Sequence, residues 1–247
     1  MTLPSEAFAL FNGRRKKEVL EMASVFGEVN NRPGPNTKHA LLNGALVLLV
    51  SSWEIYCEEV CRQAARKILE RNGLQFDQLT EQLRRDLLQY AGNEFKGNQD
   101  PLNEKVALLP DGGWKRLLSD RLDGYIREFN TPKFQRQRGK DLDGLFRLVL
   151  GARVSTAIED FLNEPQLCNN LDAIVTLRGE IAHTGEAAPE DRLTADLIRQ
   201  HTASFVEAAA AMDVVLHRDF RQRFGFAPWR ITNQVRDAIR EPARIDL

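Results

Sequence analysis

The sequence predicts an all-α protein, an up-and-down helical bundle with a helical insert between its second and third core helices. Sustained period-2 alternation of β-branched residues, the signature of strands, is absent from the sequence. Apolar residues instead recur at three- and four-residue steps over long stretches. With 247 residues, 43% of them hydrophobic, the chain is long enough to bury a substantial core.

The longest predicted helix follows a turn-rich stretch at residues 30–36 and ends near Asn72 and Gly73. Its apolar stripe runs for about seven turns, as expected of a helix that lies along a bundle. The stripe consists of Leu42, Leu46, Leu49, Trp53, Tyr56, Val60, Ala64 and Ile68. An earlier helix is expected over about residues 5–29.

The remaining chain is predicted to hold shorter helices around one further long one. The insert, at about residues 74–140, has weaker periodicity. The expected helices cover about 78–90, 114–129, 142–149, 158–162, 168–181 and 191–215. We expect one domain over residues 1–225 and a tail or an edge-packed helix over 226–247.

Charge and cysteine content restrict the function classes. Lys plus Arg total 34 against 35 Asp plus Glu, so any nucleic-acid site must be local. Three scattered cysteines do not form a secreted disulfide framework, and the start of the chain lacks a secretory signal pattern. The longest apolar run, residues 40–50, is short for a membrane span. We therefore expect a cytoplasmic protein without a membrane partner.

Motifs for bound groups are missing from the sequence. It has no Gly-rich phosphate loop, no Gly-x-Ser-x-Gly elbow and no zinc-ligand spacing. Cys57 and Cys61 share a helix face, but no histidine pairs with them, which favours small buried side chains over a metal site. We expect no cofactor and no metal.

Arg178 stands out on a helical wheel of residues 167–185. At about 100° per residue it falls in the middle of an apolar stripe with Leu171, Ile174 and Ile181. A buried guanidinium cannot lose its charge, and leaving it unpaired costs several kcal/mol in order of magnitude. Arg178 therefore needs a carboxylate, a dimer groove or a phosphate.

His183 lies five residues later, about 140° around the same wheel. Two arrangements could bring it to Arg178. Either the helix loosens before Gly185, or Arg178 of one chain meets His183 of another. Taken alone, His183 is also typical of a helix C-terminus, where a cation complements the helix dipole.

These residues resemble a known superfamily. Arg178-x4-His183, followed by Thr184 and Gly185, resembles the R-x4-6-H signature of the HEPN superfamily. Residues 51–59 are similar to the second-helix pattern of RiboL-PSP-type HEPN proteins. Residues 130–132, 142–146 and Gly151 resemble segments between those two helices, so the resemblance covers about residues 41–224.

The resemblance implies a small helical bundle that acts as a metal-independent endoribonuclease, often a toxin or an antiviral effector. Its site is a composite one at a homodimer interface, with His183 as acid and base and Arg178 as transition-state stabiliser. Such chemistry suits these side chains, since histidine titrates near neutrality and arginine binds phosphate through bidentate hydrogen bonds. RNA is the expected partner, together with an antitoxin or another protein.

Three polar residues are candidates to support this site. Glu54 matches an acidic position of the resembled helix and could pair with Arg178, or it could be a solvated flank residue. Glu180 and Thr184 are polar neighbours of the motif. Gly179 departs from the family, which commonly has Asn directly after the motif arginine.

A basic segment is the candidate contact for the RNA backbone. Lys133, Arg136, Arg138 and Lys140 lie within eight residues that contain no acid. Their cations would attract phosphates, and Phe134 among them could stack on a base. A solvated basic loop is the alternative.

Two other functions remain open at this point. Gly179 makes a non-catalytic module that binds RNA or a protein partner credible. In a purely structural protein, Arg178 would pair with an internal carboxylate such as Glu54.

Overall fold

The computed structural model describes residues 4–28, 35–95, 112–129, 132–134, 141–150, 153–184 and 193–240. All regular elements within these ranges are helical, which confirms the predicted all-α class. They are α1 (Glu6–Leu10), the π-helical turn η1 (Phe11–Arg15), α2 (Lys16–Glu28), α3 (Pro35–Glu70), the 3-10 turn η2 (Phe76–Gln78), α4 (Glu81–Phe95), α6 (Trp114–Glu128), α7 (Leu142–Leu150), α8 (Val154–Leu162), α9 (Leu167–Thr184), α10 (Ala195–Phe224) and α11 (Asn233–Asp237).

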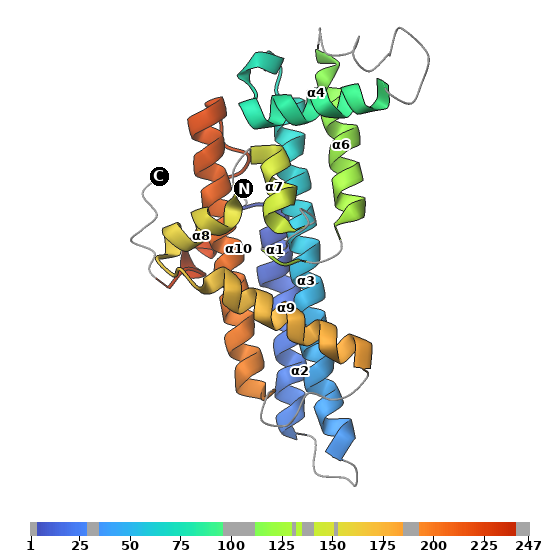
Figure 1. Cartoon of the computed structure of the whole chain (residues 1–247). Helices are drawn as coiled ribbons and strands as arrows, with labels where there is room; N and C mark the ends of the chain where they lie inside the picture. Colours follow the sequence, from blue (N-terminus) through green and yellow to red (C-terminus); the bar gives the residue numbers. More distant parts are fainter. Residues whose placement is uncertain are drawn as a thin grey trace.

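Three helices, α2, α3 and α10, run along the long axis of the molecule and pack on one another (Figure 1). The apolar stripe predicted for the longest helix lies on α3 and faces this core, where Trp53 and Tyr56 are buried. The Trp53 ring lies 5.3 Å from the ring of Phe205 on α10. Burial of the stripe along its whole length explains why a 36-residue helix forms here.

The first helical run contains a turn that the periodicity did not predict. Helices α1 and α2 are joined by η1, so the run from Glu6 to Glu28 is helical throughout but widens between Phe11 and Arg15. Ser5 begins the run, and its side chain accepts a hydrogen bond from the Phe8 backbone N–H. The extra width shifts the phase of the apolar face between α1 and α2.

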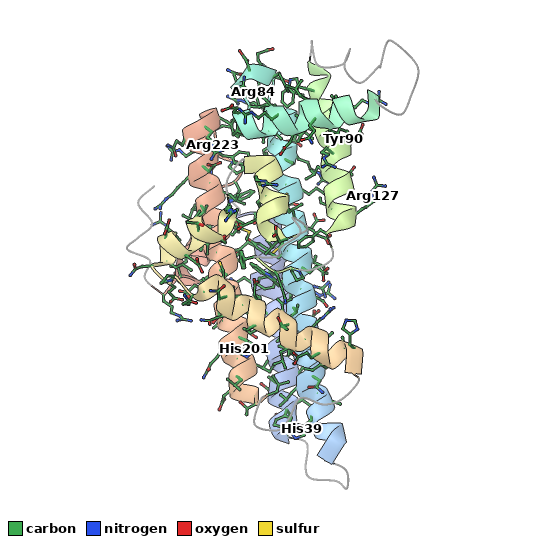
Figure 2. All side chains as sticks on the ribbon, viewed as in Figure 1. His39, Arg84, Tyr90, Arg127, His201 and Arg223 are labelled. Atoms are coloured by element: carbon green, nitrogen blue, oxygen red, sulfur yellow. The ribbon has the colours of Figure 1, made fainter. Side chains whose placement is uncertain are left out.

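Helices α4 and α6 are the described parts of the predicted insert. Helix α4 lies across one end of the bundle, and α6 runs beside α3 (Figure 1). Leu83 and Leu87 of α4 are buried, as are Leu117 and Leu118 of α6. Figure 2 places Arg84 and Tyr90 on α4 at that end of the bundle, far from the crossing of α9 with α3.

Helix α9 crosses α10 and α3 diagonally and contacts both (Figure 1). Helix α8 ends at Asn163, which adopts the left-handed conformation (φ 55°), so the chain turns sharply into α9. The Glu159 carboxylate of α8 then accepts a hydrogen bond from the Cys168 N–H in the first turn of α9 (3.1 Å). This hydrogen bond helps to fix the start of α9, and α9 positions the motif residues.

The C-terminal segment packs on the bundle. Gly225 ends α10 with φ 70°, a conformation that favours glycine. Val235 and Ile239, in and after α11, are buried. The buried Glu207 carboxylate of α10 accepts the Arg240 backbone N–H (2.9 Å), which ties this segment to α10.

Residues His39–Glu70 of α3 have the length and apolar composition of a membrane-spanning helix. Half of the most apolar stretch of this helix is buried inside the protein. The buried apolar residues of this helix belong to the core of the bundle.

Candidate functional site

Arg178 interrupts the buried face of α9. Ile174 and Ile181, on either side of it along the helix, are only 8% and 9% exposed. Arg178 itself is half-buried, on a helix that packs against α3. The helical periodicity correctly predicted this position within the stripe.

The Arg178 guanidinium has hydrogen-bonding capacity that the protein does not use. Its Nε atom is buried and has no hydrogen-bond partner. Within the described residues, no carboxylate forms an ion pair with Arg178 at 4.0 Å or less. A charged donor in this state carries a desolvation cost that an anionic ligand would relieve.

Glu54 of α3 lies within electrostatic range of Arg178. Burial raises the pKa of Glu54, and the positive charge of Arg178 acts in the opposite direction. The two side chains are therefore close enough to interact electrostatically without a direct ion pair. One turn later, burial and the charge of Glu54 raise the pKa of Glu58 as well, with Arg62 opposing.

His183 is exposed in the last turn of α9. The alternative in which the helix loosens before Gly185 is wrong, because α9 stays helical through Thr184. Five residues of α-helix separate the two side chains by about 140° around the axis and about 7.5 Å along it. Within one chain the two side chains therefore lie on different faces of α9.

Gly179 lies beside Arg178 in open space. A Cβ atom added at Gly179 would meet no heavy atom within 4 Å. The site thus has room for a side chain next to the guanidinium. Glu180 is exposed, and Thr184 is the last residue of α9.

The basic segment is described only in part. Lys133 is half-buried, whereas Arg136, Arg138 and Lys140 lie outside the described residues. Phe134 is 0% exposed, and its ring lies 5.8 Å from that of Trp53. The expectation that Phe134 stacks on an RNA base is therefore wrong, because the ring belongs to the core.

Asp172 is a residue at this site that sequence reasoning missed. Its Oδ1 accepts a hydrogen bond from the Phe134 N–H (2.8 Å), which holds the backbone of Phe134 against α9. An Asp inside a helical stripe pattern gives no sign of such a distant partner. This contact fixes the backbone of Phe134 on α9, the helix that carries Arg178.

A second missed group is buried between α1, α3 and α10. Asp213 accepts hydrogen bonds from the Ser5 N–H (3.1 Å), the Ser5 hydroxyl (2.8 Å) and the Tyr56 hydroxyl (3.1 Å). Burial raises the pKa of Asp213 to about 7. In the sequence, only the position of Asp213 within the apolar part of α10 indicates that it is buried. This network joins three helices and is structural.

Metal-ligating groups do not gather in the part of the chain that the structure describes, where no three His, Cys, Asp or Glu side chains are suitably arranged. Cys57, Cys61 and Cys168 are free and buried. Burial raises the pKa of each of these thiols, so they are not reactive thiolates. The available chemistry at the site comes from Arg178, His183 and Glu54.

Comparison with known proteins gives one result. The RiboL-PSP-HEPN family model matches residues 12–216, which include α3, α9 and most of α10. Searches of curated proteins and of solved structures gave no match. Since the match covers most of the chain, the protein belongs to the RiboL-PSP-HEPN family, a family of HEPN domains.

Proposed function

We propose that the protein is a metal-independent endoribonuclease whose site combines Arg178 of one chain with His183 of a second copy. The observation that carries this proposal is the buried, unpartnered Nε of Arg178. A guanidinium that lacks an internal partner and cannot lose its charge favours an anionic ligand. Phosphate suits it, because phosphate oxygens accept two parallel N–H bonds from arginine.

The reaction would begin at the 2′-hydroxyl of RNA. His183 of one chain takes the 2′-hydroxyl proton, and the oxygen attacks the neighbouring phosphorus. Arg178 of the other chain binds the phosphate oxygens, where negative charge increases in the transition state. The bond to the 5′-oxygen then breaks, and a protonated histidine returns a proton to that oxygen. The products are a 2′,3′-cyclic phosphate and a 5′-hydroxyl.

Glu54 orients Arg178 in this proposal. A carboxylate that faces the guanidinium without binding it leaves the N–H groups free for phosphate. Its charge also limits the freedom of the arginine side chain. Glu54 is thus a positioning residue, and its effect on RNA is indirect.

A composite site explains why the motif spans two faces of one helix. The unbroken helix separates Arg178 from His183 within a chain. A two-fold symmetric homodimer would repeat the pairing, so that each Arg178 meets the other chain's His183. A cytoplasmic toxin or antiviral effector, held inactive by an antitoxin, is the biological role that the family resemblance favours.

A cleavage assay tests the proposal. End-labelled RNA is incubated in excess chelator with the wild-type protein, with Arg178→Ala and with His183→Ala. We expect the wild type to cleave and both variants to fail, with cyclic phosphate on the 3′ ends of the upstream products. Cleavage that survives both substitutions would show that the site is wrong.

Gly179 favours a second function, RNA binding without cleavage. Glycine supplies no side-chain hydrogen bond to orient the phosphate or the histidine. The open space at Gly179 makes this function testable, since Gly179→Asn fits there. If the wild type binds RNA without cutting it, the protein is a binding module.

A further inference from the structure

The short segment Pro132–Phe134 is fixed at three points by three helices. The Trp53 indole N–H of α3 donates to the Pro132 carbonyl (3.1 Å), and the Leu142 N–H of α7 donates to the Lys133 carbonyl (2.9 Å). The Phe134 N–H donates to Asp172 of α9 (2.8 Å). Although the segment has no regular secondary structure, its backbone is held in place.

Lys133 is the residue of this segment whose side chain reaches solvent. Its neighbours Pro132 and Phe134 are buried, whereas Lys133 is half-buried. Within the described residues, the Lys133 ammonium group forms no hydrogen bond and no ion pair. The fold thus holds a cation at a defined place and does not neutralise it.

The same two helices hold Lys133 and the candidate site. Trp53, which binds Pro132, precedes Glu54, the carboxylate on which the charge of Arg178 acts. Asp172, which binds Phe134, precedes Arg178 by six residues, about 9 Å along the axis of α9 and about 120° around it. The Asp172 carboxylate is engaged by the Phe134 N–H, and the charge of Glu54 is opposed by Arg178.

We propose that Lys133 binds a phosphate of single-stranded RNA next to the phosphate at Arg178, and so positions the strand for cleavage. This inference rests on the proposed ribonuclease function. Because Phe134 is buried, the contact is ionic and has no stacking component. An ionic contact to the backbone fixes the register of the strand and does not read its sequence.

The test measures affinity as a function of salt. The probe is a fluorescein-labelled single-stranded RNA of mixed sequence with 2′-O-methyl groups throughout, which cannot be cleaved by 2′-hydroxyl attack. Fluorescence anisotropy is recorded from low to high KCl for the wild type, Lys133→Ala and Lys133→Arg. The control is Arg66→Ala, which removes an exposed cation of α3 about 18 Å along the helix from Glu54.

Removing one ionic interaction with a phosphate should lower the slope of log K against log salt by about 0.7 for single-stranded RNA. At 0.1 M salt, losing this interaction should weaken RNA binding roughly fivefold. We expect this change for Lys133→Ala, a wild-type slope for Lys133→Arg and Arg66→Ala, and unchanged melting temperatures. On cleavable RNA, Lys133→Ala should raise KM about fivefold and leave kcat near the wild-type value.

Two results would overturn the inference about Lys133, and they differ in what they mean for the ribonuclease proposal. If Lys133→Ala keeps the wild-type slope while Arg178→Ala abolishes cleavage, Lys133 does not bind a phosphate and the ribonuclease proposal stands. If the wild-type protein neither binds nor cleaves RNA, both proposals fail.

Discussion

Glu54 of α3 and Arg178 of α9 lie within electrostatic range of each other, yet they form no ion pair. The charge of Arg178 acts on Glu54, whose pKa is nonetheless raised by burial. Arg178 keeps a buried Nε without a partner. The protein therefore maintains an incompletely satisfied cation near a carboxylate that influences it.

Replacing Glu54 separates positioning from stability. In Glu54→Gln the amide no longer attracts the guanidinium, so Arg178 loses orientation and kcat should fall roughly ten- to a hundredfold. The melting temperature should not fall, because the half-buried carboxylate is itself partly desolvated. Single-turnover cleavage and thermal unfolding measure the two effects.

Glu58→Gln is the matched control for this prediction. Glu58 is one turn further along α3, and its pKa is also raised by burial, but Arg178 does not act on it. Its substitution should leave kcat near the wild-type value. Equal losses in both variants would mean that Glu54 has no specific link to Arg178.

The open position at Gly179 gives a prediction about stability. Gly179→Ala adds a Cβ that meets no atom within 4 Å, in the middle of α9. It should stabilise the protein by roughly 1 kcal/mol, because alanine loses less backbone entropy than glycine in a helix. For a chain of this size the melting temperature should rise by about 2–4 °C.

Gly225→Ala should act in the opposite direction. Its added Cβ also meets no atom within 4 Å, but Gly225 has φ 70°, where alanine is strained. The pair of variants thus compares two open glycines that differ in backbone conformation. A fall in melting temperature for Gly179→Ala would contradict the straight, unstrained helix at the motif.

Asp213 should make stability depend on pH. Its pKa in the folded protein is about 7, above the value of about 3.8 for an unperturbed Asp. Between these values the folded protein holds a proton that the unfolded chain has released, so this contribution is complete below about pH 4 and is lost as the pH rises through 7. The wild type should therefore lose stability relative to Asp213→Asn as the pH rises from 4 to 7.

Chemical denaturation at several pH values measures this difference. Asp196→Asn is the control, because Asp196 is an exposed residue of the same helix. Its stability difference from the wild type should not follow the same pH dependence. A difference between wild type and Asp213→Asn that is constant from pH 4 to 7 would refute the assignment.

The helices and the stripe position of Arg178 follow from sequence because helical periodicity records which face is buried. The stripe through Trp53 predicted α3, and the stripe through Ile174 and Ile181 predicted the place of Arg178. The burial of Phe134 did not follow, because it lies in a segment without regular secondary structure, where no period marks the inner face. Its hydrogen bond to Asp172 joins residues 38 positions apart, and local patterns do not reveal such contacts.

The central claim is that one active site is built from Arg178 of one chain and His183 of another. Mixing Arg178→Ala with His183→Ala, after unfolding and refolding them together, tests it directly. In a mixed dimer one site has lost both groups and the other has kept both. A statistical mixture should therefore recover about a quarter of the wild-type cleavage rate, although each variant alone is inactive. If the mixture stays as inactive as its components, Arg178 and His183 do not act across a dimer interface.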